Sequence, residues 1–426
     1  MKKSLAQWLT DIEALHPAEI ELGLDRIRAV YQRLPQLPQE CRVFTVAGTN
    51  GKGSVVKTIE ALGIACDKRV GVYMSPHLLC YNERVQLQQQ PVSDHELVDA
   101  FEQIDAARGD IPLTYFEFGT LAALVIFAAA DLDWVVLEVG LGGRLDAVNI
   151  VDPGVAVITS IDLDHEAWLG DTREKIGFEK AGVLRAAAAF VCGDPNPPAT
   201  VKDQALTARR TFWRGGEFDI NVTDEGSMLR FSAPESSVAG DSDCTHTVVL
   251  PGGLPVLPDN FASAVQAVVA SGQNLTPTQI VEAAGQICLP GRQQLVNKQP
   301  YVMLDVGHNP QAARALAARI EKLRHEHGIS RVICLVGMLA DKNHAASLAG
   351  LLSQVDQWWP VSLDVESRAS AANTLAECLW QAGAVVAGMS DSPCRAYRVL
   401  YPELRPDDLL VVFGSFHTVA DVIHNT

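Results

Sequence analysis

A glycine-rich turn between a strand pattern and a helix pattern constrains the fold of this chain more than any other feature. The apolar run Val43–Val46 predicts a β-strand, the turn follows at residues 48–53, and a helical pattern extends from Val55 to Cys66. In such a turn the backbone N–H groups and the helix N-terminus face an anion, and Lys52 adds a positive charge. The Ser54 hydroxyl suits Mg²⁺ or a phosphate oxygen. We therefore predict a phosphate-binding loop.

The turn departs from the common phosphate-loop pattern at two positions. Val46 stands where that pattern has its first glycine, and Gly53 separates Lys52 from Ser54. The alternative interpretation is an ordinary glycine-rich connection between a strand and a helix. The order of strand, turn, lysine, hydroxyl and helix favours the phosphate-binding loop.

Length and composition limit the class of protein. A chain of 426 residues predicts two domains, with a third left open, and 48% hydrophobic residues suffice for large cores. The net charge of −17 and the lack of long Lys/Arg runs argue against a nucleic-acid partner. Nine cysteines without a C-x-x-C motif predict reduced thiols. No apolar run is long enough to span a bilayer, so we expect a cytoplasmic protein without membrane contact.

Strand and helix patterns alternate through most of the first half of the chain. This alternation predicts a mainly parallel sheet that is covered by helices on both faces. The predicted strands are Val43–Val46, Val70–Tyr73, Trp134–Val139 and Val155–Ser160, and the predicted helices are Val55–Cys66, Asp94–Ala107, Phe118–Ala130 and Arg173–Ala181.

The pattern changes from about Ala187 to Leu250, where short alternating runs predict a small antiparallel region. Residues 289–299 have few periodic apolar positions, and the alternation of strands and helices restarts at Tyr301. We therefore predict an α/β fold. Residues 1–287 would form a phosphate-loop domain with a parallel sheet and a small antiparallel subregion, residues 288–298 a linker, and residues 299–426 a smaller α/β domain.

Polar side chains follow three of the predicted parallel strands. Ser75, Glu138 and His165 each lie at or just after a strand end, where ligands collect in open parallel sheets. A hydroxyl, a carboxylate and an imidazole there could converge on one divalent metal beside the phosphate loop. Taken singly, such a histidine is more often a hydrogen-bonded loop residue and such a glutamate is usually solvated. Glu138 lies in the apolar run Val135–Val139, so its carboxylate needs a metal or a partner.

Besides the phosphate loop, the chain carries a series of distinctive short motifs. In order they are Glu21-Leu22-Gly23-Leu24, Ser75-Pro76-His77-Leu78, Thr114–Thr120, Glu138–Asn149, Asp164-His165, Glu179-Lys180-Ala181-Gly182, Leu289-Pro290-Gly291-Arg292 and Asp305–Pro310. With the loop at Thr45–Ser54, they closely resemble the folylpolyglutamate synthase/dihydrofolate synthase family. The phosphate loop alone is shared with the Mur ligases, whereas the combination is specific. The resemblance implies an ATP-dependent, amide-forming ligase with an N-terminal ATPase domain and a C-terminal Rossmann-like domain.

By this resemblance, specific side chains bind the nucleotide and the metal. The ATP-binding residues would be Thr49, Asn50, Gly51, Lys52, Gly53, Ser54, Asn260, Arg292 and Asp305. The Mg²⁺ ligands would be Ser75, Glu138 and His165, and the catalytic residues Lys52, Lys180 and His308. Lys180 matches a lysine that is carbamylated in the family, and a carbamate would turn this cation into a carboxylate-like group. Without the resemblance, Lys180 is a solvated lysine at a helix end, favourable to the helix dipole.

Three segments match the family's pterin site. We expect two of them, Thr114–Glu117 and Leu145–Ala147, to form loops at adjacent strand ends that enclose a pterin ring. Phe116 would supply the apolar face, while Thr114 and Asp146 would bind the edge of the ring. The alternative places Phe116 in the core and makes Asp146 a loop cap. The predicted pterin contacts are Glu21, Leu22, Gly23, Leu24, Thr114, Tyr115, Phe116, Glu117, Leu145, Asp146 and Ala147.

The segments Arg144–Ala147 and Leu113–Phe118 resemble the bifunctional bacterial members of the family. The implied reaction adds L-glutamate to dihydropteroate, giving dihydrofolate, and to reduced folates, giving folylpolyglutamates, through an acyl phosphate. The implied co-substrate is ATP, the cofactor is Mg²⁺ with K⁺ as a further candidate ion, and the protein is expected to be a monomer. The alternatives are a monofunctional folylpolyglutamate synthase, a Mur-type amino-acid ligase and, from a different class, a regulatory nucleotide switch.

Overall fold

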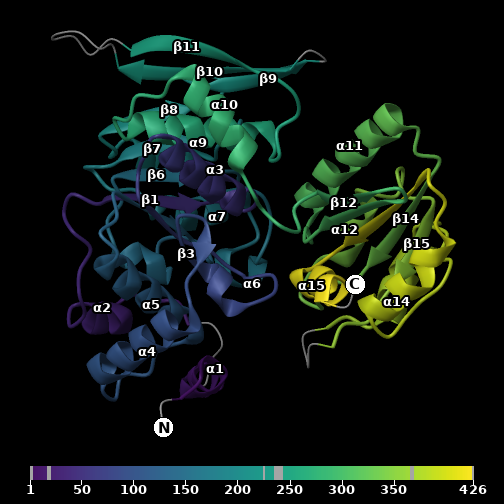
Figure 1. Ribbon diagram of the computed structural model, residues 1–426, viewed down its shortest axis with the longest axis horizontal. Coiled ribbons are helices and arrows are strands. Elements are labelled where there is room, and N and C mark those ends of the chain that lie inside the picture. The colour runs from purple at the N-terminus through teal and green to yellow at the C-terminus, as the bar shows by residue number, and fades with distance from the viewer. Residues whose placement is uncertain (1–2, 17–20, 224–225, 235–242, 365–368, 425–426) are drawn as a thin grey trace. The chain divides into compact units, whose positions relative to one another are not determined.

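The computed structural model describes residues 3–16, 21–223, 226–234, 243–364 and 369–424. The chain divides into two units (Figure 1). The first unit comprises Met1–His77 and Tyr81–Cys288, and the second comprises Leu78–Cys80 and Leu289–Thr426. None of the helices in the described part of the chain has the length and apolarity that crossing a bilayer requires.

A sheet of eight strands forms the centre of the first unit. In order across the sheet, the strands are β4 (Gln90–Pro91), β3 (Val85–Leu87), β2 (Val70–Tyr73), β5 (Trp134–Glu138), β1 (Arg42–Ala47), β6 (Val155–Ile158), β7 (Ala189–Cys192) and β8 (Arg210–Trp213). The six neighbouring strands β2, β5, β1, β6, β7 and β8 run parallel, while β3 and β4 pair antiparallel at one edge. Because β1 lies between β5 and β6, it is buried on both faces and therefore apolar. The carboxyl ends of β1, β2, β5 and β6 meet at one edge of the sheet.

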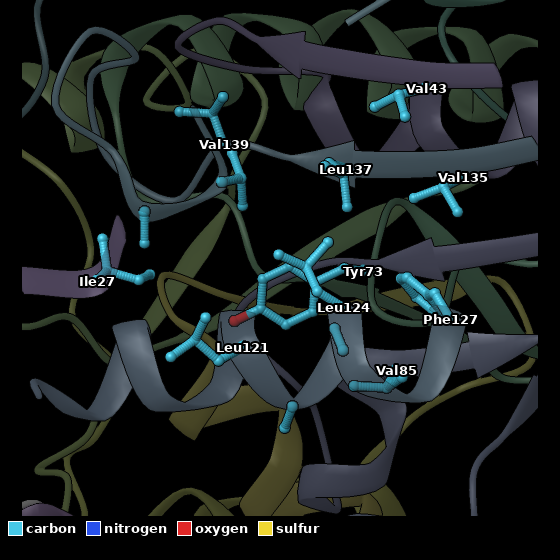
Figure 2. Packing of buried hydrophobic residues seen from close by; sticks show 14 of the residues in the cluster. Ile27, Val43, Tyr73, Val85, Leu121, Leu124, Phe127, Val135, Leu137 and Val139 are labelled. Atoms are coloured by element: carbon cyan, nitrogen blue, oxygen red, sulfur yellow. The ribbon is translucent and has the colours of Figure 1, made fainter. Parts of the chain in front are cut away.

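One face of this sheet carries the larger apolar core of the unit. It is covered by α1 (Leu5–Leu15), α2 (Asp25–Tyr31), α4 (Asp94–Arg108), α5 (Tyr115–Ala129), α7 (Arg173–Ala181) and α8 (Ala199–Ala205). Figure 2 shows Leu121, Leu124 and Phe127 of α5 packed among the side chains of Tyr73 and Leu137. Residues 117–127 of α5 are all buried and mostly apolar, as expected of a helix that is enclosed over most of its length.

The opposite face is covered by α3 (Lys52–Ala65), α9 (Pro258–Ala270) and α10 (Pro277–Gln286), which Figure 1 shows beside the sheet. The antiparallel sheet β9 (Asp219–Thr223), β10 (Gly226–Pro234) and β11 (Asp243–Leu250) packs on the same core. Helix α3 approaches the strands closely at Gly63. A Cβ atom there would lie 2.7 Å from Val70 and 2.8 Å from Trp134. The helix that follows the phosphate loop is therefore seated directly on the sheet.

The second unit is built on five strands. Their order is β12 (Gln294–Lys298), β13 (Tyr301–Asp305), β16 (Asp408–Phe413), β14 (Arg331–Val336) and β15 (Gln357–Pro360), with only β12 antiparallel. The helices of this unit are α11 (Pro310–His327), α12 (His344–Ala349), α13 (Ala372–Gln381), α14 (Pro393–Leu400) and α15 (Phe416–His424). Apolar clusters lie on both faces of the sheet. Leu78 contributes to one of them, beside Val306 and Val419.

The α/β fold is confirmed, and several of the predicted elements differ in detail. The segment predicted to be antiparallel also contains β7 and β8, which extend the parallel sheet. The sequence pattern did not indicate these two strands, because four residues are too few to show a period. The segment predicted to be a linker contains β12, which pairs with β13. Helix α5 begins at Tyr115, so Thr114–Glu117 is a helix N-terminus and not a loop at a strand end. The reason is a capping box between Thr114 and Glu117.

The packing of α5 gives a stability prediction. Phe127 is completely buried between α5 and the sheet. We expect Phe127→Ala to lower the free energy of unfolding by about 3–5 kcal/mol, because it removes apolar contacts and leaves a cavity. The measurement is chemical unfolding of the full chain followed by fluorescence. Val222→Ala, at a side chain on the exposed face of β9, is the control and should change this energy by less than about 0.5 kcal/mol. Equal effects of the two substitutions would contradict the packing described here.

Candidate active site

The predicted phosphate loop leaves β1 and enters α3 through two glycines. Gly48 and Gly51 have φ values of 147° and 85°, conformations that other residues rarely adopt. A Cβ at Gly48 would lie 1.8 Å from Thr159 Oγ1, and one at Gly51 would lie 2.3 Å from Asn260 Oδ1. Helix α3 has no side-chain cap at its N-terminus. Its first-turn N–H groups and the positive end of its dipole therefore suit an anion.

Two lysine amines donate to the same carbonyl of this loop. Lys52 Nζ donates to the Gly48 carbonyl oxygen over 3.1 Å and to that of Thr49 over 3.2 Å. Lys180 Nζ, at the end of α7, donates to the Gly48 oxygen over 2.8 Å. Lys180 is 4% exposed, so it is not the solvated helix-end lysine of the alternative interpretation.

The pKa of Lys180 is lowered from 10.5 to about 7. Burial is the largest cause, because it disfavours the charged amine, and the positive charge of Lys52 adds to the effect. The carboxylates of Asp164 and Asp146 act in the opposite direction and only partly compensate. A neutral amine near physiological pH is a nucleophile, whereas an ammonium ion is not.

Glu138 and Ser75 are brought together at the carboxyl ends of β5 and β2. The buried Glu138 carboxylate accepts a hydrogen bond from the Ser75 backbone N–H over 3.3 Å. One carboxylate and one hydroxyl, completed by phosphate oxygens, form a donor set that fits Mg²⁺. In the part of the chain that the structure describes, no group of three or more His, Cys, Asp or Glu side chains could hold a metal alone. A metal here would need further oxygen ligands, which a nucleotide or water can supply.

His165 lies in the loop between β6 and α6 (Glu166–Leu169). It caps α6 in the left-handed conformation, with φ of 52°, and its backbone N–H donates to Asp164 Oδ1 over 2.9 Å. Its side chain is 38% exposed. The convergence of His165 on Ser75 and Glu138 stays a prediction.

Asp146 is buried in the loop after β5, where it organises the backbone. Its carboxylate accepts hydrogen bonds from the N–H groups of Leu141, over 2.8 Å, and Val148, over 3.0 Å. It is therefore the loop cap of the alternative interpretation. Burial raises the pKa of Asp146 to about 6, although these hydrogen bonds and the charge of Lys52 lower it.

Three of the other predicted pterin contacts, Glu21, Thr114 and Glu117, meet at an arginine that sequence reasoning missed. Arg26 Nε donates to Glu117 Oε2 over 2.8 Å, and the same guanidinium pairs with Glu21. Glu117 Oε2 also accepts from the Thr114 N–H. Its other oxygen, Oε1, is buried and has no hydrogen-bond partner among the described residues. Arg26 lies next to Asp25 on α2, 91 positions before Glu117, so no local pattern indicates the pair.

Phe116 connects this cluster with the loop after β5. Its ring lies so close to Gly140 that a Cβ there would be 2.6 Å from the Phe116 ring. Its centroid is 6.0 Å from that of Tyr73. Phe116 is only partly buried, so it is not the enclosed core residue of the alternative interpretation. The structure thus joins two of the segments that were predicted to bind a pterin. Leu22, Gly23, Leu24, Tyr115, Leu145 and Ala147 lie in the same segments, and their contacts with a ligand stay predictions.

The predicted nucleotide residues of the second unit, Arg292 and Asp305, lie near the carboxyl end of β13. Asp305 is buried, and its Oδ1 accepts from the Gly307 N–H over 2.6 Å. Burial raises the pKa of Asp305 to about 6, against the effect of the Arg292 charge. The Arg292 guanidinium lies over the Phe416 ring at 5.4 Å. His308 Nδ1 is 3.1 Å from the Val306 carbonyl oxygen. Asn260 belongs to the first unit, where it lies against Gly51.

Comparisons with known proteins find relatives that match almost the whole chain. The family described as Mur ligase, glutamate ligase domain matches residues 291–416. The dihydrofolate synthase/folylpolyglutamate synthase of Escherichia coli (strain K12) is 43% identical, over 98% of this chain and 94% of that protein. The structure of E. coli FolC in complex with DHPP and ADP has a TM-score of 0.90 at 43% identity, covering 99% of this chain and 97% of that chain. A bifunctional folylpolyglutamate synthase/dihydrofolate synthase with Mn, AMPPNP and L-glutamate bound has a TM-score of 0.86 at 42% identity, covering 99% and 98%.

The lowered pKa of Lys180 predicts a pH-dependent contribution to stability. Between pH 7 and pH 10.5 the unfolded chain binds more protons at this lysine than the folded chain does. The contribution of Lys180 is therefore least favourable below pH 7 and improves as the pH rises. We expect the stability of the wild type relative to Lys180→Met to increase from about pH 7 to about pH 9, measured by chemical unfolding. Lys175→Met, at an exposed position of α7, is the matched control and should show no such trend. A difference between wild type and Lys180→Met that falls with pH would contradict the assignment.

Proposed function

Because this chain belongs to the dihydrofolate synthase/folylpolyglutamate synthase family, we propose that it is an ATP-dependent ligase that joins L-glutamate to dihydropteroate and to reduced folates. The observation that carries the proposal is the pair of lysines, Lys52 and Lys180, on the Gly48 carbonyl of an anion-binding loop. A regulatory switch has no need of the second, buried lysine. The relatives solved with ADP, AMPPNP, DHPP and L-glutamate support the same set of substrates.

The reaction follows from the chemistry of its substrates. A carboxylate is a poor acyl donor at neutral pH, so the acceptor's carboxylate oxygen attacks the γ-phosphorus of ATP and ADP leaves. The α-amine of glutamate then attacks the acyl phosphate, and phosphate leaves as the amide forms. The loop from Gly48 to Ser54 would hold the phosphates in line through backbone N–H groups, and Lys52 would neutralise developing charge. His308 is proposed as a further catalytic residue that helps to orient the transfer.

We propose Mg²⁺ as the metal, held by Ser75, Glu138 and His165 together with phosphate oxygens. When bound, it would stabilise negative charge on the transferred phosphoryl group. A relative solved with Mn, AMPPNP and L-glutamate bound supports the use of a divalent metal. K⁺ is proposed as a further ion without assigned ligands.

We propose that Lys180 is carbamylated. The neutral amine, which a pKa of about 7 makes available, would add to CO₂ and release a proton. A carbamate nitrogen keeps one hydrogen, so the hydrogen bond to the Gly48 oxygen is compatible with the modification. The product would place a negative group beside the Lys52 amine, with which Lys180 shares the Gly48 carbonyl oxygen.

For the pterin, we propose the surface formed by Phe116, the loop around Asp146 and the cluster of Thr114, Glu117 and Glu21. Phe116 would pack on the ring. A carboxylate has about four acceptor sites, so Asp146 keeps capacity for a ligand beyond its backbone bonds to Leu141, Val148 and Gly140. The proposed location is the cytoplasm, in keeping with nine free thiols, and the proposed oligomeric state is a monomer.

The deciding experiment is glutamate-dependent phosphate release from ATP. We expect turnover with dihydropteroate and with a reduced folate, and none with a UDP-muramyl peptide. Lys52→Ala should lower kcat by about 10²–10³-fold, because it removes the cation fixed at the phosphates, while the unfolding transition stays in place. Lys202→Ala, on the exposed side of α8, is the control and should keep full activity. Activity with reduced folates alone would leave a monofunctional polyglutamate synthase, and activity with the UDP-muramyl peptide would favour a Mur-type ligase.

A second test addresses the pterin surface. Asp146→Asn keeps the shape of the side chain and removes its charge. We expect it to raise KM for dihydropteroate by about tenfold, since a charged acceptor bond is lost, and to leave ATP affinity nearly unchanged. The measurements are steady-state kinetics with each acceptor and calorimetry with an ATP analogue. An equal loss of ATP affinity would show that Asp146 acts on the phosphate loop and not on the pterin.

A further inference from the structure

The phosphate loop is fastened to the loop between β6 and α6, residues 159–165. The Thr49 N–H donates to the Ser160 carbonyl oxygen over 2.7 Å. The Thr49 hydroxyl donates to the Asp162 carbonyl oxygen over 3.1 Å and accepts from the Asp162 N–H over 3.0 Å. Thr159 Oγ1 donates to the Asn50 carbonyl oxygen over 2.6 Å. Both polar hydrogens of Thr49 thus point to the neighbouring loop, and neither serves an anion.

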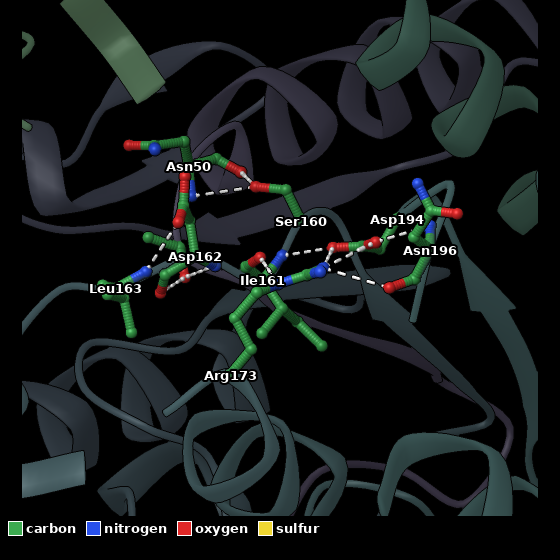
Figure 3. Close-up of polar contacts among 9 residues, drawn as sticks. Asn50, Ser160, Ile161, Asp162, Leu163, Arg173, Asp194 and Asn196 are labelled. Atoms are coloured by element: carbon green, nitrogen blue, oxygen red, sulfur yellow. Dashed lines mark hydrogen bonds and ion pairs between the residues drawn. The ribbon is translucent and has the colours of Figure 1, made fainter. Parts of the chain in front are cut away.

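The β6–α6 loop is held in turn by one ion pair. Arg173 Nη2 lies 3.1 and 3.0 Å from the two carboxylate oxygens of Asp194. Arg173 Nε donates to the Ile161 carbonyl oxygen over 2.9 Å, and Asp194 Oδ2 accepts from the Ile161 N–H over 2.7 Å. The pair therefore occupies both polar groups of the Ile161 backbone, as Figure 3 shows. Ile161 directly precedes Asp162, which is bonded to Thr49.

The surroundings of the pair make it stiff. Asp194 is 4% exposed and also accepts from the Asn196 N–H, while Arg173 donates to the Asn196 carbonyl oxygen. Charge-assisted bonds of this kind are stronger than neutral ones, and the burial of the Asp194 carboxylate reduces their screening by salt. Arginine is required, because its fork reaches a carbonyl and a carboxylate at once, whereas lysine presents a single ammonium group.

We infer that Arg173 and Asp194 are positioning residues for the phosphate loop. They fix Ile161 and Asp162, and Asp162 sets Thr49, so that the loop N–H groups are arranged before the nucleotide arrives. The inference rests on the proposed use of this loop for ATP. It also assigns Thr49 the role of a fastening point, in place of the direct phosphate contact expected from the sequence. The same loop carries Asp164 and His165, so its position governs two further groups of the proposed site.

The test measures nucleotide affinity apart from catalysis. Arg173→Lys, Arg173→Met and Asp194→Asn are titrated with a non-hydrolysable ATP analogue and Mg²⁺ by calorimetry, and thermal unfolding is recorded for each. The matched control is Arg331→Met in the second unit. Arg331 also makes two hydrogen bonds to one carboxylate, that of Asp408, although it uses Nε and Nη2 where Arg173 uses Nη2 alone. The side chains of Arg331 and Asp408 are 30% and 0% exposed, against 39% and 4% for Arg173 and Asp194.

We expect each variant of the Arg173–Asp194 pair, Arg173→Lys included, to weaken binding of the analogue by about tenfold or more, since small displacements of a binding loop are costly. The control should lose thermal stability and keep its affinity. Thr49→Val should weaken binding as well, and Arg173→Met combined with Thr49→Val should weaken it by less than the product of the two effects, because both act on one connection.

Unchanged affinity in Arg173→Lys, or multiplicative effects of Arg173→Met and Thr49→Val, would overturn the inference. The affinity measurement does not depend on the acceptor substrate. A wild-type protein that binds the analogue but releases no phosphate with any folate would refute the proposed function and leave this test intact. If Arg173→Met and Asp194→Asn do not fold, the decision rests on Arg173→Lys and Thr49→Val. The inference then stands only if both variants bind the analogue more weakly than the wild type and unfold at the same temperature.

Discussion

Two lysine amines on one carbonyl oxygen are the interaction on which the proposed chemistry depends. Lys52 comes from the start of α3 and Lys180 from the end of α7, so the Gly48 carbonyl ties two helices to the end of β1. Two ammonium groups that share one hydrogen-bond acceptor repel each other, and burial adds a desolvation cost. The protein resolves the conflict by lowering the pKa of the more buried lysine to about 7. In the proposed mechanism one amine, that of Lys52, stays a cation for the phosphates, while that of Lys180 is neutral and can react.

The local field at this site differs from that of the whole chain. With a net charge of −17, the protein repels nucleotides at long range. Attraction must come from groups within a few ångströms of the phosphates, which salt screens least. The uncapped N-terminus of α3, Lys52 and a bound cation can supply it. Asp146 and Asp164 are near enough to raise the pKa of Lys180 and are outweighed by its burial.

Interactions between residues close in the sequence could be predicted, whereas those between distant residues could not. The strand β1, the glycines of the loop and helix α3 are encoded within a few neighbouring residues, so their pattern was readable. The start of α5 was also encoded locally, by Thr114 and Glu117 as a capping box, although the helix was predicted to begin only at Phe118. The proximity of Ser75 and Glu138 was predictable, because the carboxyl ends of neighbouring parallel strands lie at the same edge of the sheet. Arg26 with Glu117 and Arg173 with Asp194 are separated by 91 and 21 positions and obey no period, so only the fold reveals them.

The tripeptide Leu78–Cys80 belongs to the second unit, although the chain on both sides of it belongs to the first. Leu78 packs beside Val306 and Val419, in a core whose other residues lie beyond position 300. During synthesis on the ribosome, this leucine emerges long before the strands that surround it. The first unit can assemble early, whereas the second must wait for the end of translation and then enclose a segment already made. A gene fragment that starts at Leu289 would encode a core with one of its side chains missing. Cutting the chain between Cys288 and Leu289 would therefore separate the two sheets, but it would leave Leu78 on the fragment that does not contain its core.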